Sequence, residues 1–200
     1  MYNLKKRLEV TLLKKVILLG DSIRQYYQEE AIKNLGSEYT VWQPGENCRF
    51  ARFTLNSLRF WLPECPNPDI IHWNNGLWDT AQIYEEDGSF TPIEEYISDM
   101  KKILRELKKT GAKVIFATIT PVNPKKELDP KSKNVNSRIA EYNRRITEVM
   151  KVEGVPVNDL YSLVYPNIES YICEDYVHLT QAGKEACGKA VADAIKHVSE

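Results

Sequence analysis

Short apolar runs alternate with longer amphipathic stretches along most of this chain. The runs are rich in β-branched and aromatic residues, and several end at glycine or at another turn signal. A short apolar run that ends at a turn is typical of a strand buried on both faces. The sequence therefore predicts five strands, at residues 16–19, 39–42, 69–73, 113–118 and 155–158.

Between these runs, apolar residues recur at helical spacing. One helix is expected to follow residue 22, and others to cover residues 50–62, 91–111, 139–149 and the stretch after Thr180. In the third of these, Thr91 is expected to cap the helix, Pro92 to take the first helical position and Glu94 to complete a capping box. Thr180 is expected to cap the last helix.

Five strands separated by helices predict the α/β fold class. The sheet should be mostly parallel, with five strands, right-handed crossovers and helices on both faces. The chain has 200 residues and shows no internal repeat or linker, so one domain over residues 1–200 is expected.

The charge balance excludes some classes of protein. There are 27 basic and 28 acidic residues without a long block of like charge, which argues against binding to nucleic acid or to a membrane surface. No run is long enough to span a membrane, and Lys14 and Lys15 interrupt the apolar stretch that a secretory signal would need. A cytoplasmic location is therefore expected. The four cysteines form no C-x-x-C pair, and we expect neither a metal nor an organic cofactor.

The first candidate for chemistry is the sequence Gly20-Asp21-Ser22, which directly follows a buried strand and precedes a helix. At such a helix start, backbone N–H groups are unpaired and the helix dipole favours negative charge. Open α/β sheets also bind their ligands at this edge. Ser22 is thus a candidate nucleophile, and its own N–H is a candidate donor to an oxyanion.

A serine nucleophile needs a base, and the chain has three histidines. His178 has Asp175 three residues upstream, so within a turn this carboxylate can orient the imidazole. His72 also follows an aspartate by three residues, but in a strand that spacing puts the two side chains on opposite faces. His197 has Asp193 one helical turn before it, yet it lies at the end of the last helix, far in sequence from any strand end.

Two further sources of oxyanion donors follow the other strands. They are a backbone N–H of the turn at residues 44–47 and a side-chain amide from Asn74 or Asn75. All would lie at the carboxyl ends of strands, on the same edge of the sheet as Ser22. Removal of one such donor typically costs about 3–4 kcal/mol of transition-state stabilisation.

These residues resemble the motifs of the SGNH hydrolases, also called GDSL esterases and lipases. Gly20-Asp21-Ser22-Ile23 is similar to the first block of that family, Asp175-Tyr176-Val177-His178 to its last block, and Gly45 lies near the glycine of its second block. The resemblance implies a flavodoxin-like α/β/α sandwich. It also implies that Ser22 is the nucleophile, His178 the base and Asp175 its orienting partner.

The third block departs from the family pattern. The family usually has G-x-N-D, whose asparagine donates to the oxyanion, whereas Gly76-Leu77-Trp78-Asp79 puts a tryptophan there. The sequence Asn-Asn-Gly-Leu-Trp-Asp is similar to a subgroup of these enzymes, and the resemblance transfers the oxyanion role to Asn74, with Asn75 as the alternative. For the second block, Gly45 is the expected donor, with Asn47 or Cys48 as alternatives.

Together these observations predict a serine esterase that cleaves a short acyl or O-acetyl ester. Its substrate would be a small molecule or a carbohydrate ester. Two alternatives remain. One is an acyltransferase with the same triad, and the other is a non-catalytic α/β binding domain in which the triad residues do not meet.

Overall fold

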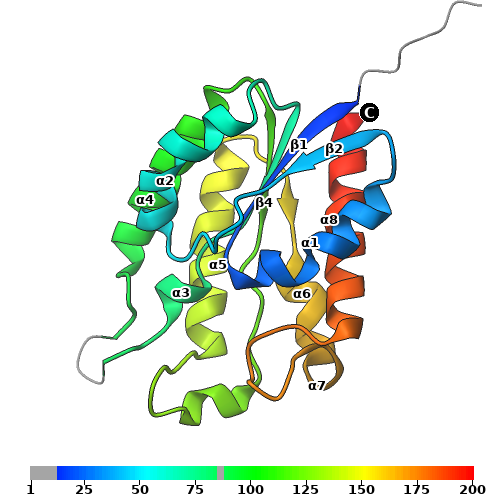
Figure 1. Ribbon diagram of the computed structural model, residues 1–200. Coiled ribbons are helices and arrows are strands. Elements are labelled where there is room, and N and C mark those ends of the chain that lie inside the picture. Colours follow the sequence, from blue (N-terminus) through cyan, green and yellow to red (C-terminus); the bar gives the residue numbers. More distant parts are fainter. Residues whose placement is uncertain (1–12, 85–87) are drawn as a thin grey trace, which may run out of the picture.

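The computed structural model describes residues 13–84 and 88–200, and a five-stranded parallel sheet runs through them (Figure 1). The strand order is β2-β1-β3-β4-β5, and every neighbouring pair is parallel. This is the flavodoxin-like order, so the expected fold class is confirmed. The strands are β1 (Lys14–Leu19), β2 (Tyr39–Trp42), β3 (Ile70–Trp73), β4 (Lys113–Ala117) and β5 (Val157–Asn158).

Helices cover both faces of the sheet. On one face, α1 (Ser22–Leu35) packs along α8 (Gln181–Ser199), and on the other α2 (Ala51–Trp61) packs on α4 (Ile93–Lys108), which neighbours α5 (Asn136–Val152) (Figure 1). Several shorter segments were not predicted by the sequence pattern. They are the helices α3 (Leu77–Thr80), α6 (Leu160–Val164) and α7 (Ile168–Tyr171), and the 3₁₀ turns η1 (Leu62–Glu64), η2 (Pro124–Leu128) and η3 (Tyr165–Asn167).

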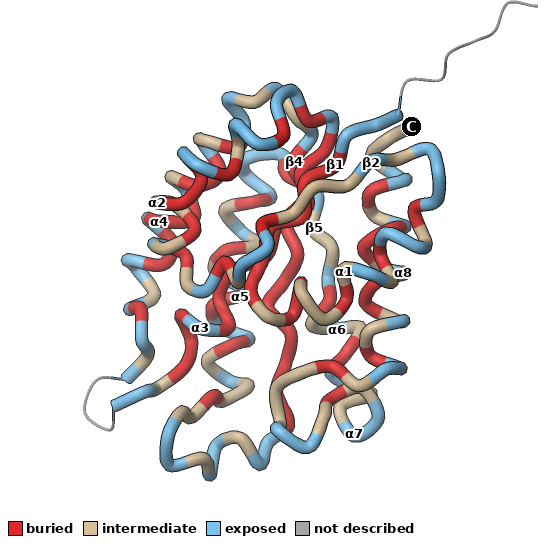
Figure 2. Tube along the Cα trace, in the orientation of Figure 1, coloured by how far each residue is buried: buried red, intermediate tan, exposed pale blue. Residues whose placement is uncertain are grey.

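The apolar runs form the middle of the sheet. Four consecutive residues of β1 and all four of β3 are buried, because helices cover both faces of these strands (Figure 2). A strand that is covered on both sides needs apolar residues at every position, which explains why these runs do not alternate with polar residues.

The strand register aligns the carboxyl ends of the central strands. Leu19 pairs with Trp73, and Trp73 pairs with Phe116. The segments that follow β1, β3 and β4 therefore leave the sheet at one edge. Polar residues that directly follow these strands are brought together there although they are far apart in the sequence.

Helices α1 and α8 approach each other closely at Gly188. A Cβ atom at this position would lie 2.5 Å from Cβ of Glu30 and 2.8 Å from the backbone nitrogen of Ala31. Glycine is thus required for this contact. The contact matters for the site described below, because α1 begins at Ser22 and α8 begins three residues after His178.

The helix start expected at residues 91–94 is wrong by one position. Pro92 is the N-cap, α4 begins at Ile93, and no side chain caps it. The Thr91 side chain instead hydrogen-bonds to Asp79, and Glu94 pairs with Arg145 at 2.8 Å. Tertiary partners thus take both side chains that a capping box would use. The cap expected at Thr180 is confirmed, since its hydroxyl accepts the N–H of Gly183.

Within residues 13–84 and 88–200, no helix has the length and apolar character needed to cross a membrane. The basic stretch that was weighed as a secretory signal lies largely in residues 1–12, outside the described residues.

Candidate active site

The turn between β1 and α1 places Ser22 at the first position of a helix. Asp21 is the N-cap, and its buried carboxylate accepts the backbone N–H of Ile23 at 3.0 Å. Gly20 leaves no room for a side chain, because a Cβ atom there would lie 1.9 Å from Oδ1 of Asn74. Among the described residues, the backbone N–H of Ser22 has no hydrogen-bond partner, as expected for the first turn of a helix.

The structure brings Ser22, His178 and Asp175 together. Oγ of Ser22 lies 2.9 Å from Nε2 of His178, although the two residues are 156 positions apart. The other ring nitrogen, Nδ1, lies 2.7 Å from Oδ2 of Asp175. This is the geometry of a nucleophile, a base and an orienting carboxylate.

Asp175, which orients the His178 ring, is itself held by backbone N–H groups of the turn that carries His178. Its Oδ1 accepts the backbone N–H groups of Val177 and His178, at 3.0 and 2.9 Å. Partial burial disfavours the charged form of Asp175, but the hydrogen bonds from the backbone and ring of His178 and from Val177 outweigh it, and its pKa is lowered. The carboxylate is therefore ionised and favours a proton on Nδ1, which leaves Nε2 free to accept one from Ser22.

Tyr26 contacts the face of the His178 ring. The two rings are nearly parallel, at an interplanar angle of 13° and a centroid distance of 4.6 Å. Tyr26 lies four residues after Ser22 on α1, so both side chains are on one face of that helix. This i, i+4 spacing is the signal in the sequence that could have assigned Tyr26 to the site.

The segment after β2 is tied to the nucleophile turn. The backbone N–H of Cys48 donates to the carbonyl of Gly20 at 3.1 Å, and the N–H of Gly20 donates to Sγ of Cys48 at 3.3 Å. The buried guanidinium of Arg24 donates to the carbonyl of Glu46 at 2.7 Å. Burial raises the pKa of the Cys48 thiol to about 11, so this cysteine is a neutral packing residue beside the site.

Of the candidate donors in this segment, Asn47 reaches the site and Gly45 does not. Gly45 is exposed and has open space around it. Asn47 is half-buried and lines the same cleft as Ser22 and His178. Its Oδ1 accepts the N–H of Arg49 at 2.7 Å, whereas its own backbone N–H has no partner in the described part of the chain.

The two asparagines after β3 both lie inside the protein, and neither lines the cleft. Asn74 is 3% exposed, and its Nδ2 lies 3.5 Å from Oδ1 of Asp21. Asn75 donates to the carbonyl of Arg49 at 3.0 Å and accepts the indole N–H of Trp73 at 2.7 Å. The amide of Asn75 thus holds the strand end against the loop at residue 49.

The cleft at this edge of the sheet has a volume of about 500 Å³. Its walls come from α3, from the loop at residues 120–134 and from the turn that carries His178. Trp78, at the position of the expected asparagine, is 39% exposed and forms part of the wall. The residues that line the cleft are Ser22, Asn47, Leu77, Trp78, Ala81, Ile83, Lys126, Lys131, Ser132, Asn134, Val177 and His178.

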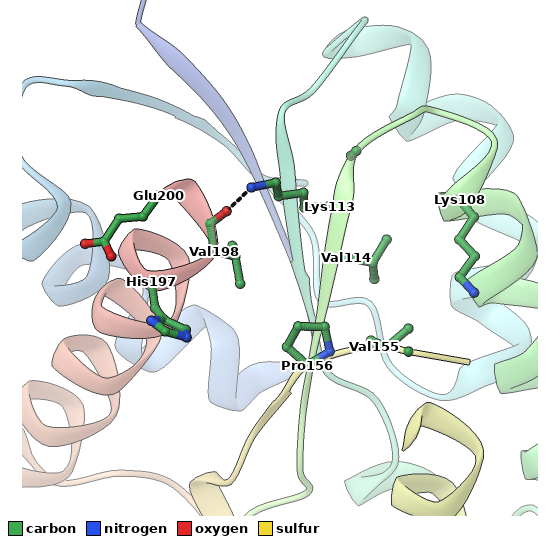
Figure 3. A pocket seen from close by; sticks show the side chains of 10 residues that line it. Lys108, Lys113, Val114, Val155, Pro156, His197, Val198 and Glu200 are labelled. Atoms are coloured by element: carbon green, nitrogen blue, oxygen red, sulfur yellow. Dashed lines mark hydrogen bonds between the residues drawn. The ribbon is translucent and has the colours of Figure 1, made fainter. Parts of the chain in front are cut away.

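The other two histidines are separate from this cleft. His72 is fully buried, with Nε2 at 3.1 Å from Nδ2 of Asn158, and burial lowers its pKa to about 3, so it is neutral. His197 lines a second hollow of about 490 Å³ near the end of α8, together with Val114 and Pro156 (Figure 3). Asp193, which was weighed as its partner, pairs with Lys189 at 2.5 Å.

Two carboxylates near the cleft, those of Asp21 and Asp79, are fully buried. Burial raises the pKa of Asp21 to about 6 and that of Asp79 to about 7, although hydrogen bonds from the chain oppose both shifts. Asp79 accepts the backbone N–H of Ala51 with both oxygens. These carboxylates are structural parts of the turn and of the start of α2, since neither lines the cleft.

Comparison with known proteins identifies one family. The model of the GDSL-like lipase/acylhydrolase family matches residues 18–186, which include both the nucleophile turn and the turn that carries His178. A comparison with curated protein sequences finds no significant match.

Solved structures share the fold over nearly the whole chain. The lipase/acylhydrolase from Enterococcus faecalis is 21% identical, with a TM-score of 0.79 over 93% of this chain and 97% of that one. A putative acylhydrolase from Bacteroides fragilis is 21% identical, with a TM-score of 0.74 over 94% and 88%. A catalytic mutant of Axe2, an acetylxylan esterase from Geobacillus stearothermophilus, is 15% identical, with a TM-score of 0.72 over 92% and 96%.

Proposed function

The chain belongs to the GDSL-like lipase/acylhydrolase family, whose members act on esters, and we propose that it is a serine esterase with Ser22 as nucleophile. The observation that carries this proposal is the hydrogen-bonded series from Ser22 through His178 to Asp175, at 2.9 and 2.7 Å. A binding domain has no need for a hydroxyl, an imidazole and a carboxylate in this order at the wall of a cleft.

The proposed reaction has two halves. Oγ of Ser22 attacks the ester carbonyl and its proton passes to Nε2 of His178, while Asp175 holds the resulting imidazolium. Collapse of the tetrahedral intermediate breaks the bond to the alcohol, which leaves with the proton from His178. Water then attacks the acyl-enzyme, again with His178 as base, and releases the acid and Ser22.

For the oxyanion we propose the backbone N–H groups of Ser22 and Asn47. Both residues line the cleft, and both N–H groups are unpaired within the described ranges. Cys48, the other alternative in this segment, donates its N–H to Gly20. Asn47 therefore takes the place expected for Gly45, and the side-chain donor expected at Asn74 has no counterpart in this proposal.

For the substrate we propose an ester with a short acyl group, such as an O-acetyl group on a carbohydrate. Apolar walls from Leu77, Ala81 and Val177 suit a small acyl group. Trp78 offers an aromatic surface on which a sugar ring can stack. An acetylxylan esterase among the structures of the same fold is consistent with this substrate class.

The test is hydrolysis of p-nitrophenyl esters by the wild type, Ser22→Ala and His178→Ala. Ser170→Ala is the matched control, because Ser170 is exposed and does not line the cleft. We expect the wild type and Ser170→Ala to turn over the acetate and the two triad variants to be inactive but folded by circular dichroism. Activity that falls from acetate to octanoate supports the short-acyl substrate, and equal activity in all four proteins contradicts the proposal.

A further inference from the structure

The His178 ring is fixed at both nitrogens, by Ser22 on one side and Asp175 on the other. These two hydrogen bonds define an axis through the ring, but rotation about that axis changes neither distance greatly. Such a rotation does worsen the angles of both hydrogen bonds. Hydrogen bonds to an imidazole prefer the plane of the ring, and rotation tilts the lone pair and the N–H of the ring away from their partners. A third contact, against the face of the ring, is needed to fix the plane.

Tyr26 supplies that contact. Its ring lies 4.6 Å from the imidazole at an angle of 13°, so it presents its face to the face of His178. We infer that Tyr26 is a positioning residue for His178, and that its ring favours the imidazolium that forms when His178 accepts the serine proton. The inference rests on the proposed function, since it concerns the base of that reaction.

The second part of the inference follows from the charge of the ring face. The π face of tyrosine carries partial negative charge and attracts a cation placed over it. Neutral imidazole gains less from this contact than imidazolium does. In the proposed reaction the imidazolium forms as Ser22 gives up its proton, so the contact contributes to the rate of the chemical step more than to substrate binding.

Tyr26 is itself held from a second element. Nζ of Lys184, in the first turns of α8, lies 4.9 Å from the centroid of the Tyr26 ring. Tyr26 thus lies between α1, which carries it, and α8, which follows the His178 turn. The ring joins α1, which begins at the nucleophile, to α8, which follows the turn that carries the base, and it fixes the base relative to both.

The test compares Tyr26→Phe with Tyr26→Leu in the hydrolysis of p-nitrophenyl acetate. Phenylalanine keeps the aromatic face, whereas leucine keeps apolar bulk without it. We expect Tyr26→Leu to lower kcat by about tenfold with KM within about twofold of the wild type, and Tyr26→Phe to retain kcat within about threefold. The rate of labelling of Ser22 by a fluorophosphonate should fall in parallel for Tyr26→Leu, because this reaction needs the same base.

A matched control removes an equivalent stack whose residues do not line the cleft. Tyr161 and Tyr165 stack at 5.3 Å and 18°, and Tyr165→Leu should leave kcat unchanged. The inference is overturned if Tyr26→Leu keeps the wild-type kcat, if Tyr26→Phe loses as much as Tyr26→Leu, or if KM alone changes. Failure of the proposed function is distinguishable, because in that case the wild type is inactive or Ser22→Ala remains active.

Discussion

Both carboxylate oxygens of Asp79 accept the backbone N–H of Ala51, at 3.2 and 3.1 Å, which joins α3 to the start of α2. Phe50, the N-cap of α2, makes no side-chain cap of its own. A residue 28 positions away in the sequence therefore satisfies the first N–H of this helix. Because Asp79 is fully buried, the protonation of this carboxyl group differs between the folded and unfolded chain.

This difference predicts how stability depends on pH. The pKa of Asp79 is raised from 3.8 to about 7 because burial disfavours the charged form. Between these values the folded protein binds a proton that the unfolded chain does not, so the free energy of unfolding falls as pH rises through the window. Asp79→Asn should lose less stability between pH 4 and 7 than the wild type, by up to about 4 kcal/mol. Urea unfolding at several pH values measures this, and parallel curves for the two proteins would contradict it.

Asp175→Asn tests the orienting role of the carboxylate. The amide keeps an acceptor for the N–H groups of Val177 and His178 but removes the charge that stabilises the imidazolium. We expect kcat for p-nitrophenyl acetate to fall by about 10⁴-fold, with little change in the unfolding midpoint. A loss of less than about tenfold in a folded variant would show that Asp175 does not act through His178.

Asn47→Asp tests the proposed oxyanion donors. A carboxylate beside the developing oxyanion opposes its charge, so kcat/KM should fall by about 10²-fold or more. Gly45→Ala is the control, because it keeps its backbone N–H and meets open space, and it should match the wild type. Equal activity of Asn47→Asp and the wild type would place the oxyanion elsewhere.

Gly188→Ala tests the contact between α1 and α8. The added Cβ meets Cβ of Glu30 and the backbone of Ala31 at distances that no packed structure allows, so the helices must separate. We expect a loss of about 1–3 kcal/mol in stability. We also expect a loss of activity in the folded variant, since separation of these helices moves Ser22 relative to His178. Differential scanning calorimetry and ester hydrolysis measure the two effects, and wild-type values in both would contradict the account.

The sequence predicted the strands and long helices well because their signals are local. The apolar run at residues 16–19 becomes a strand buried on both faces, and the β-branched and aromatic run at residues 39–42 becomes an edge strand in which no residue is fully buried. The short helices α3, α6 and α7 escaped prediction because four or five residues carry no periodic signal, and tertiary contacts rather than propensity stabilise such segments.

The proximity of Ser22 and His178 could be anticipated because each lies beside an element boundary that the sequence marks. Ser22 follows a glycine at a strand end, and His178 precedes a capping threonine. The orientation of Asn74 and Asn75 could not be anticipated, because the alternation of side chains ends with β3 at Trp73. Beyond that point the backbone turns, and both asparagines are buried.

The role of Ser22 is tested most directly by the position of a covalent adduct. The protein is treated with a fluorophosphonate and digested, and the labelled peptide is identified by mass spectrometry in the wild type, Ser22→Ala and His178→Ala. The account predicts one adduct, on Ser22 in the wild type, with none in Ser22→Ala and much slower labelling in His178→Ala. An adduct on another serine, or equal labelling of all three folded proteins, would contradict it.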